Sequence, residues 1–352
     1  FLNGEFDLDS SPSSYFVGDN GCNISESDAK VIAERFHALT GYDGGGYGKQ
    51  ILNKRTGSFI ARLDWNISSR HNLSLRYNFL DARKDEFVSS AMLLRFNGEG
   101  YTSTADNHSI VGELNSRLSD KMFNEFRVGY TRVHDGRDAM SGAKFPYVEI
   151  LKMRDGDNTS VYIGTDPFAI MNDLVQNTVT LTDNFSYYAK SHTITIGTHN
   201  EIFNSSCLYM ANALGAYTYN TLDDFLADNP RKYVRNYAVG NPATNVTTAQ
   251  FGLYIQDEWN ASPRFSMTYG LRADVPMVFG NPPTNEAFNS SDIAKKYGIK
   301  TNQMARPMVL LSPRIGVRWR IAESDTSLTL LRGGVGIFSG RIPFVWFSNC
   351  FS

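Results

Sequence analysis

The side chains that most often carry catalysis or bind metals show none of the spacings that such chemistry needs. The chain has six His and three Cys. No two His occur in the HExxH spacing of a zinc site, and no two Cys form a CxxC motif. The sequence also has no G-x-S-x-G nucleophile elbow and no phosphate-binding P-loop. We therefore expect no enzyme, no cofactor and no bound metal, and the pairing of Cys22, Cys207 and Cys350 stays open.

The charged and amide side chains occur instead at every second position of apolar segments. Such a polar face can line a water-filled path, hold another domain, or be a hydrated wall with ion pairs inside it. Its mixed signs indicate no charge preference for a transported molecule. The net charge of −2, from 34 Lys and Arg and 36 Asp and Glu, gives no support to nucleic-acid binding. The residues expected on the polar face are Arg62, Asp64, Arg76, Glu113, Asn115, Arg117, Glu125, Arg127, Gln256, Glu258, Arg272, Asp274, Arg318 and Arg320.

A two-residue alternation of apolar and polar side chains positions that face. Its strands, about ten in number and about ten to fourteen residues long, exceed the length typical of soluble proteins and can cross a bilayer. An apolar face toward lipid and a polar face toward a wet lumen predict an all-β protein, an antiparallel transmembrane β-barrel. A soluble sandwich or propeller is the alternative. The alternation predicts hairpins at 58–83, 108–133, 174–204, 247–275 and 312–338.

The connections between strands alternate between short turns and long loops. The turns inside hairpins have about three to five residues, whereas the loops between hairpins have about 24 to 42. Outer-membrane barrels have this asymmetry, with the long loops outside the cell. The long loops are 84–107, 134–173, 205–246 and 276–311. Their aromatic side chains would either contact a cargo or pack the loops together: Tyr101, Phe145, Tyr147, Tyr162, Tyr209, Tyr217, Tyr219 and Phe225.

The two ends of the chain differ from this pattern. We expect 1–57 to be an extracellular loop or extension with one short helix, from about Ser25 to Leu39 and ended by Gly41. Residues 58–347 would form a partial barrel, and 348–352 look like a truncated end of a longer chain. The helix would bury a common face made of Val31, Ile32, Phe36 and Leu39.

Two hairpins resemble TonB-dependent outer-membrane receptors. The segments 251–259 (FGLYIQDEW) and 267–272 (MTYGLR) are similar to a Y-x-Q-D-x-W … G-x-R hairpin that is frequent in their barrels. The segments 311–316 (LSPRIG) and 331–338 (LRGGVGIF) resemble the next hairpin of that family. Segments 61–66 (ARLDWN), 71–73 (HNL) and 340–346 (GRIPFVW) resemble its Oar-like branch. The family-motif residues are Tyr254, Gln256, Asp257, Trp259, Gly270, Arg272, Pro313, Arg314, Gly316, Arg332, Gly333 and Gly334.

This resemblance implies a function as well as a fold. It implies that the chain is the central part of a 22-stranded barrel whose plug domain and energy-coupling box lie outside it. Such a receptor would sit in the cell outer membrane of a Gram-negative bacterium and import a bulky nutrient, whether peptide, glycan or metal chelate. Its partners would be outer-membrane lipid and a TonB-type energy-coupling protein, reached through the missing N-terminal region. The alternatives are a passive porin-like or structural barrel and a surface enzyme barrel.

Overall fold

The computed structural model describes the chain except at residues 19–20, 143, 155–156, 305, 324–325 and 341–352. Strands account for 59% and helices for 10%, so the expected all-β class is confirmed. The described helices are all too short or too polar to cross a bilayer. Cys350, most of the segment 340–346 and the end at 348–352 lie outside the described residues.

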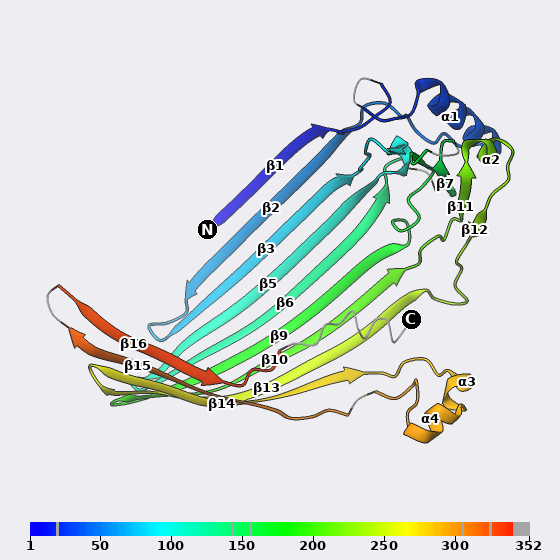
Figure 1. Ribbon diagram of the computed structural model, residues 1–352. Coiled ribbons are helices and arrows are strands. Elements are labelled where there is room, and N and C mark those ends of the chain that lie inside the picture. Colours follow the sequence, from blue (N-terminus) through cyan, green and yellow to red (C-terminus); the bar gives the residue numbers. More distant parts are fainter. Residues whose placement is uncertain (19–20, 143, 155–156, 305, 324–325, 341–352) are drawn as a thin grey trace.

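Eleven antiparallel strands form one large curved sheet, which we call the wall (Figure 1). Each strand pairs with the next along the wall, in the order β1-β2-β3-β5-β6-β9-β10-β13-β14-β15-β16. The wall is not closed, as expected for part of a barrel. Its strands are β1 (Leu2–Pro12), β2 (Ile51–Asn66), β3 (His71–Glu86), β5 (Tyr101–Ser119), β6 (Met122–Ala139), β9 (Asn172–Ala189), β10 (His192–Tyr209), β13 (Ala243–Ser262), β14 (Phe265–Phe279), β15 (Leu310–Glu323) and β16 (Leu328–Gly336).

Strand β1 is one that the alternation in the sequence did not predict. It pairs with β2 from Leu2 opposite Ala61 to Pro12 opposite Ile51, within the segment expected to be a loop with a helix. The strand is rich in Asp and Ser, which are depleted in strands, so its own composition gives a weak signal. Its long ladder with β2 is what stabilises it.

The wall strands are also longer than predicted, and the extra length lies away from the short turns. Strand β13 has 20 residues and β5 has 19. The ladder between β3 and β5, for example, continues to Glu86 opposite Tyr101. Continued pairing satisfies backbone groups beyond the length that a bilayer requires.

At one end of the wall, the long loops fold together with a segment near the N-terminus into a compact unit, which we call the cap (Figure 1). The loops were expected to carry no structure of their own, but three of them supply a second sheet in the order β12-β11-β7-β8-β4. Two of its pairings, β11 with β7 and β4 with β8, are parallel and join different loops. The cap contains β4 (Leu93–Arg95), η1 (Asn97–Glu99), β7 (Tyr147–Lys152), β8 (Ser160–Ile163), β11 (Ala216–Thr221), α2 (Leu222–Leu226), β12 (Lys232–Val234) and α1 (Glu26–Thr40).

Helix α1 begins and ends where its capping residues predict. The Ser25 hydroxyl accepts a hydrogen bond of 3.1 Å from the Asp28 amide, which satisfies one of the free N–H groups of the first turn. Gly41 ends the helix with φ of 74°, a left-handed conformation that suits glycine. The buried face differs from the expected one: Ala29, Ile32 and Phe36 are buried, whereas Val31 and Leu39 are 40% and 39% exposed.

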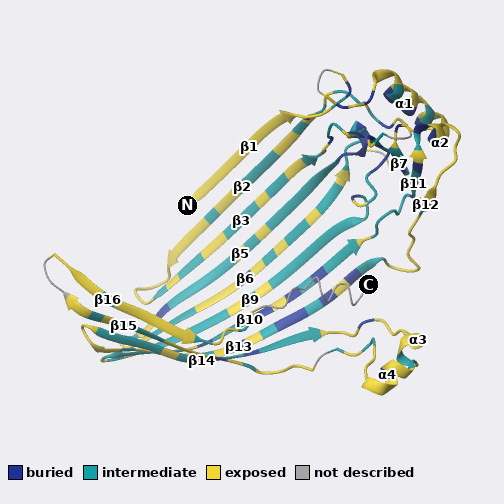
Figure 2. Ribbon diagram, in the orientation of Figure 1, coloured by how far each residue is buried: buried dark blue, intermediate teal, exposed yellow. Residues whose placement is uncertain are grey.

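The buried hydrophobic core lies in the cap rather than in the wall (Figure 2). Phe36 of α1 packs edge-on against Phe145, with ring centres 5.7 Å apart. The N-terminal segment is also joined to η1 by backbone hydrogen bonds, such as Asn97 N–H to Gly46 O at 2.7 Å. A wall one sheet thick, with lipid on one side and a lumen on the other, has no comparable interior. The core is Val17, Cys22, Ile24, Ala29, Ile32, Phe36, Leu94, Phe96, Phe145, Val148, Ile150, Met153, Val161, Ile163, Tyr219, Leu222 and Phe225.

The loop between β14 and β15 carries two short helices, α3 (Glu286–Asn289) and α4 (Asp292–Tyr297). Side chains of Asn285 and Ser291 cap their N-termini. Of the cysteines that the structure describes, Cys22 is a buried free thiol in the cap and Cys207 is a free thiol on β10.

Candidate functional site

One face of the wall, which we call the inner face, collects the polar side chains expected to line a lumen. Residues directly opposite each other in an antiparallel ladder share a face. From β5 to β14 one such row reads Glu113, Arg127, Thr182, His199, Gly252 and Asp274. The next row, from β5 to β15, reads Asn115, Glu125, Asn184, Gly197, Tyr254, Arg272 and Ser312.

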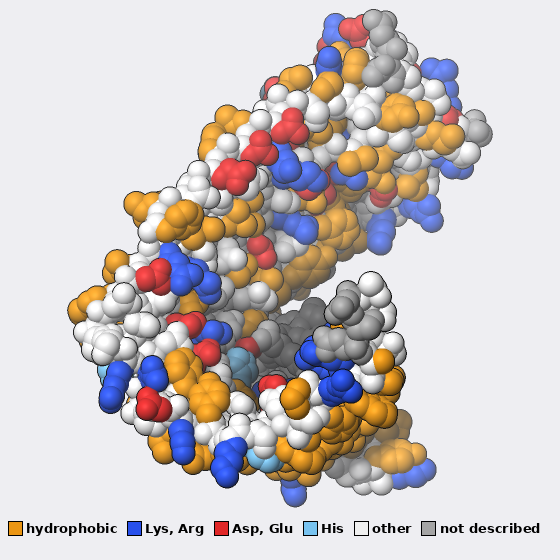
Figure 3. Space-filling model, turned by 90° about the vertical axis from the view of Figure 1, so that its left-hand side faces the viewer, with side chains coloured by type: hydrophobic (Ala, Val, Ile, Leu, Met, Phe, Trp, Pro, Cys, Tyr) orange, Lys and Arg blue, Asp and Glu red, His pale blue; other side chains and the backbone are white. Residues whose placement is uncertain are grey.

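The opposite face, which we call the outer face, is mainly apolar. The residues between those rows include Leu114, Phe126, Leu253, Ala273 and Leu311, which lie opposite one another along the wall. Leu253 is 64% exposed and Leu311 57% exposed, although neither is polar. Figure 3 shows hydrophobic side chains spread along the wall and the hollow that its curvature leaves. An exposed apolar band of this kind is suited to contact with lipid.

Several inner-face charges neutralise one another. Arg127 lies 2.8 Å from both Glu113 and Glu125, and Arg62 lies 2.9 Å from Asp64. These side chains are largely exposed, so each pair contributes little to stability. Here the charged residues form the hydrated, internally paired wall that was the plainer of the alternatives from the sequence.

The family-motif residues divide between the two faces. Asp257, Trp259, Pro313 and Gly333 lie on the outer face, in register with Tyr269, Met267, Leu271 and Val317 respectively. The others lie on the inner face: Tyr254, Gln256, Gly270, Arg272, Arg314, Gly316, Arg332 and Gly334.

On the inner face, Tyr254 connects three strands. The guanidinium carbon of Arg272, its partner on β14, lies 5.3 Å from the centre of the Tyr254 ring, a cation–π contact. The Tyr254 hydroxyl donates a hydrogen bond to the side-chain oxygen of Asn184 on β9, across the whole width of β10. Strand β10 carries Gly197 at this point, where a Cβ would lie 2.6 Å from both Asn184 Oδ1 and the Tyr254 ring. A residue with a side chain at 197 would therefore block the contact.

A second contact of this type involves Arg314 and Gln256. Arg314 Nη2 donates a hydrogen bond of 2.6 Å to Gln256 Oε1. Gly270 is the residue between them, opposite Gln256 on one side and Arg314 on the other. The motif residues on this face are thus brought together across neighbouring strands.

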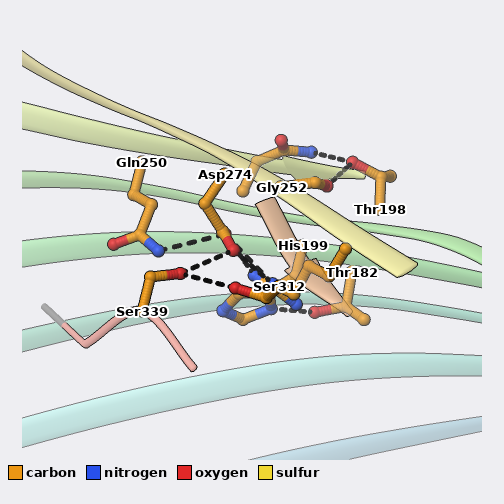
Figure 4. Close-up of polar contacts among 10 residues, drawn as sticks. Thr182, Thr198, His199, Gln250, Gly252, Asp274, Ser312 and Ser339 are labelled. Carbon is orange, nitrogen blue, oxygen red and sulfur yellow. Dashed lines mark hydrogen bonds and ion pairs between the residues drawn. The ribbon is translucent and has the colours of Figure 1, made fainter. Parts of the chain in front are cut away.

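The most buried acidic group of the inner face is Asp274, whose side chain is 2% exposed. Its carboxylate accepts hydrogen bonds from Arg272 Nε and Nη2 at 2.8–3.0 Å and from Gln250 Nε2 at 3.1 Å. Ser339, just after β16, donates a further bond of 3.3 Å and also contacts Ser312 (Figure 4). This network joins β13, β14 and β15 to the segment that follows β16.

On the outer face, Asp257 and Trp259 lie near the short turn between β13 and β14. Asp257 Oδ2 is bonded to His192 Nδ1 at 2.7 Å and to the Tyr269 hydroxyl at 2.6 Å. The His192 ring stacks on Trp259 with centres 5.9 Å apart. Amphipathic aromatic groups with polar tips are typical of the boundary between lipid and water.

The cap contains a pocket of about 470 Å³ that the sequence did not reveal. Three long loops line it, because the parallel pairing of β7 with β11 and of β4 with β8 brings them together. No short-range pattern in the sequence could have indicated contacts between loops so far apart in the chain. Its lining includes Arg95, Glu99, Tyr147, Glu149, Tyr162, Asp166, Phe168, Asn212, Thr218 and Lys232.

Glu99 is the buried acid of the cap pocket, with a side chain 1% exposed. Arg95 Nη1 donates to both of its carboxylate oxygens, at 2.9 and 2.8 Å. Burial is the largest influence on this group and, against the attraction of Arg95, raises the pKa of Glu99 from 4.5 to about 8. Burial likewise raises the pKa of Tyr147. The inner end of the pocket is therefore poorly hydrated.

The loop aromatics have two different roles. Phe145, Tyr219 and Phe225 are at most 2% exposed and belong to the cap core, so they pack the loops together. Tyr147 and Tyr162 line the pocket, with ring centres 5.5 Å apart in an edge-to-face arrangement. Among the described residues, no group of three or more His, Cys, Asp or Glu is placed to hold a metal ion.

A curved antiparallel wall with an apolar outer face and a polar inner face defines the class: this is a piece of a transmembrane β-barrel. The chain belongs to the outer membrane beta barrel domain family, whose family model matches residues 30–349. The protein is therefore assigned to the outer membrane of a Gram-negative bacterium.

Solved structures of similar fold are outer-membrane transporters and receptors. The outer membrane transporter YddB from Escherichia coli matches with a TM-score of 0.53 and 11% identity, covering 91% of this chain and 34% of that one. The copper transporter OprC gives 0.46 and 16%, covering 84% and 38%. The ferric-catecholate import receptor Fiu from Escherichia coli K12 gives 0.45 and 12%, covering 79% and 42%. No curated protein matches the sequence.

The chain spans only about a third of the length of the YddB chain. At such low identities the likeness shows the fold alone. What those proteins transport therefore says nothing by itself about the cargo of this chain.

Proposed function

We propose that the chain is the central part of the barrel of an energy-coupled, TonB-dependent receptor of the Oar-like branch, which imports a bulky nutrient. The observation that carries this proposal is the folded cap at one end of a polar inner face (Figure 1). A cored cap built from several loops can select a cargo before it enters the lumen. A passive channel has no need of such a unit.

In this mechanism the cap captures the nutrient and the inner face holds a plug domain contributed by another part of the parent protein. Tyr254, Arg272 and Arg314 present aromatic and guanidinium groups on that face, anchored by Asn184, Asp274 and Gln256. Donors held in fixed positions suit reversible contact with a polar domain surface. A TonB-type protein would then supply the energy that displaces the plug.

The motif glycines have a structural part in the same proposal. Gly270 leaves room for the Arg314–Gln256 contact, and Gly316 and Gly334 face each other with no side chains between them and the lumen. Asp257 and Trp259 anchor the outer face near the short turn. Pro313, Arg332 and Gly333 complete the hairpin that resembles the family.

The test is the electrical conductance of the product of the complete open reading frame in a planar bilayer bathed in KCl. A plugged, energy-coupled receptor is expected to give no steady open-channel current at rest. Deletion of the plug from the same protein should then produce a large ohmic conductance. A steady large conductance of the intact protein would contradict the proposal and favour a passive porin-like barrel.

A further inference from the structure

The cap pocket has the size and enclosure of a binding site for a small ligand or for one part of a large one. Its volume of about 470 Å³ falls within the roughly 300–1,000 Å³ of ligand pockets. The walls come from the regular strands β7, β8 and β11 and not from free loops. Strand-borne side chains hold a fixed geometry, which favours recognition of a defined shape.

Aromatic rings supply flat apolar surfaces in this pocket. Phe168 is 50% exposed, and Tyr162 is half-buried beside Tyr147. The Arg95 guanidinium covers the Tyr162 ring from 5.2 Å. The face of an aromatic ring is electronegative, so it attracts cations and the polarised C–H groups of a sugar ring.

The charges of the pocket argue against an anionic ligand. Arg95 is already bonded through two contacts to Glu99, which neutralises it. Of the other charged lining residues, Lys232 is basic, whereas Glu149 and Asp166 are acidic. A carboxylate-rich or phosphate-bearing ligand would meet more repulsion than attraction here.

The polar atoms of the pocket alternate between donors and acceptors. Glu149 and Asn212 offer acceptor oxygens, and Lys232, Thr218 and the tyrosine hydroxyls offer donors. Thr218 Oγ1 donates to Glu149 Oε2 at 3.2 Å, which orients that carboxylate. Groups of both kinds are what the hydroxyls of an uncharged sugar require, because each hydroxyl both donates and accepts.

We propose that the cap pocket binds a short neutral oligosaccharide, by stacking it on Tyr162 and Phe168 and hydrogen-bonding it to Glu149 and Lys232. The inference rests on the proposed function, since it makes this pocket the place where the imported cargo is recognised. The cargo is accordingly a glycan, or a glycosylated molecule whose sugar enters the pocket.

Calorimetric titration of the product of the complete open reading frame tests this proposal. The probes are maltotriose, cellotriose, mannotriose and laminaritriose, with a sialylated trisaccharide and a neutral tripeptide for comparison. At least one neutral trisaccharide should bind, and the sialylated sugar should not. Phe168→Ala and Glu149→Gln should each weaken binding about tenfold, the worth of one stacking contact or one charged hydrogen bond.

Tyr237→Ala is the matched control, because Tyr237 lies in the same loop region, is 79% exposed and does not line the pocket. It should bind like the unaltered protein. Binding of no neutral trisaccharide, binding that all three variants retain, or binding of the tripeptide alone would overturn the proposal. The conductance experiment separates the two hypotheses: a closed barrel that binds no sugar contradicts only the glycan assignment.

Discussion

Arg314 on β15 reaches Gln256 on β13 across the strand that separates them, with a hydrogen bond of 2.6 Å over Gly270. Glycine is needed there because a Cβ at 270 would lie 2.8 Å from the Ile255 carbonyl oxygen and 3.2 Å from Gln256 Cβ. The three residues are family-motif positions, and their spacing in the sequence becomes a single contact in space.

Gly270→Ala is expected to destabilise the barrel by about 1–3 kcal/mol, the usual effect of overpacking, because the backbone at Ile255 cannot move aside freely. Denaturant unfolding of the intact protein in lipid vesicles measures this change. Gly316→Ala is the control on the same face, since its nearest atom would be 3.9 Å away. Equal stability of the two variants would contradict the crowding at 270.

Asp274→Asn should destabilise the wall by about 3 kcal/mol, because it removes the charge partner of Arg272 at a site only 2% exposed. Asp64→Asn is matched to it, since Arg62 and Asp64 have the same two-residue spacing but Asp64 is 58% exposed. The control should unfold at the same denaturant concentration as the unaltered protein. A similar loss in both variants would argue against a special role for the buried pair.

Phe36→Ala should loosen the cap without opening the wall. The ring is fully buried against Phe145, so its removal should cost about 3–5 kcal/mol of cap stability. Hydrogen exchange should quicken in β7 and β11 and stay unchanged in β5 and β6. Val31→Ala on the exposed side of the same helix should change neither. Faster exchange across the whole wall would show that cap and wall unfold together.

The stability of the cap should fall as the pH rises from about 4.5 to about 8, because the pKa of Glu99 is raised on folding. The folded cap binds this proton more tightly than the unfolded one, so the stabilisation is complete below pH 4.5 and is lost through pH 8. Hydrogen exchange of 93–99, corrected for intrinsic rates, measures the effect. Glu99→Gln should remove this pH dependence. An unchanged profile in that variant, or protection that rises with pH, would contradict the raised pKa.

The two faces of the wall were predictable from the sequence because side chains alternate strictly along a strand. Arg62, Asp64 and Arg76 were expected on one face and are found there, opposite one another or in the same register. The same alternation cannot reveal how far a strand continues once it leaves the bilayer. For this reason the strands were predicted too short.

The cap was not predictable, because its sheet depends on contacts between distant loops. Ala216 pairs with Tyr147, and Leu93 with Ser160, in parallel ladders that leave no local pattern. Helix α1 was foreseen from its capping residues, but its buried face was decided by what it packs against. Ala29 faces the core, and Val31 does not.

The assignment of an inner and an outer face is the claim on which the whole account depends. Neighbouring residues of β9 test it: Leu181 lies on the outer face and Thr180 on the inner one. Each would be replaced by Cys and spin-labelled in the intact protein in lipid bilayers, with Cys22, Cys207 and Cys350 changed to Ser. Collision of the label with oxygen reports lipid, and collision with a water-soluble nickel chelate reports water.

We predict a high ratio of oxygen to nickel collisions for Leu181→Cys and a low ratio for Thr180→Cys. Equal ratios at the two positions, or the reverse order, would contradict a wall with lipid on one side and a polar lumen on the other.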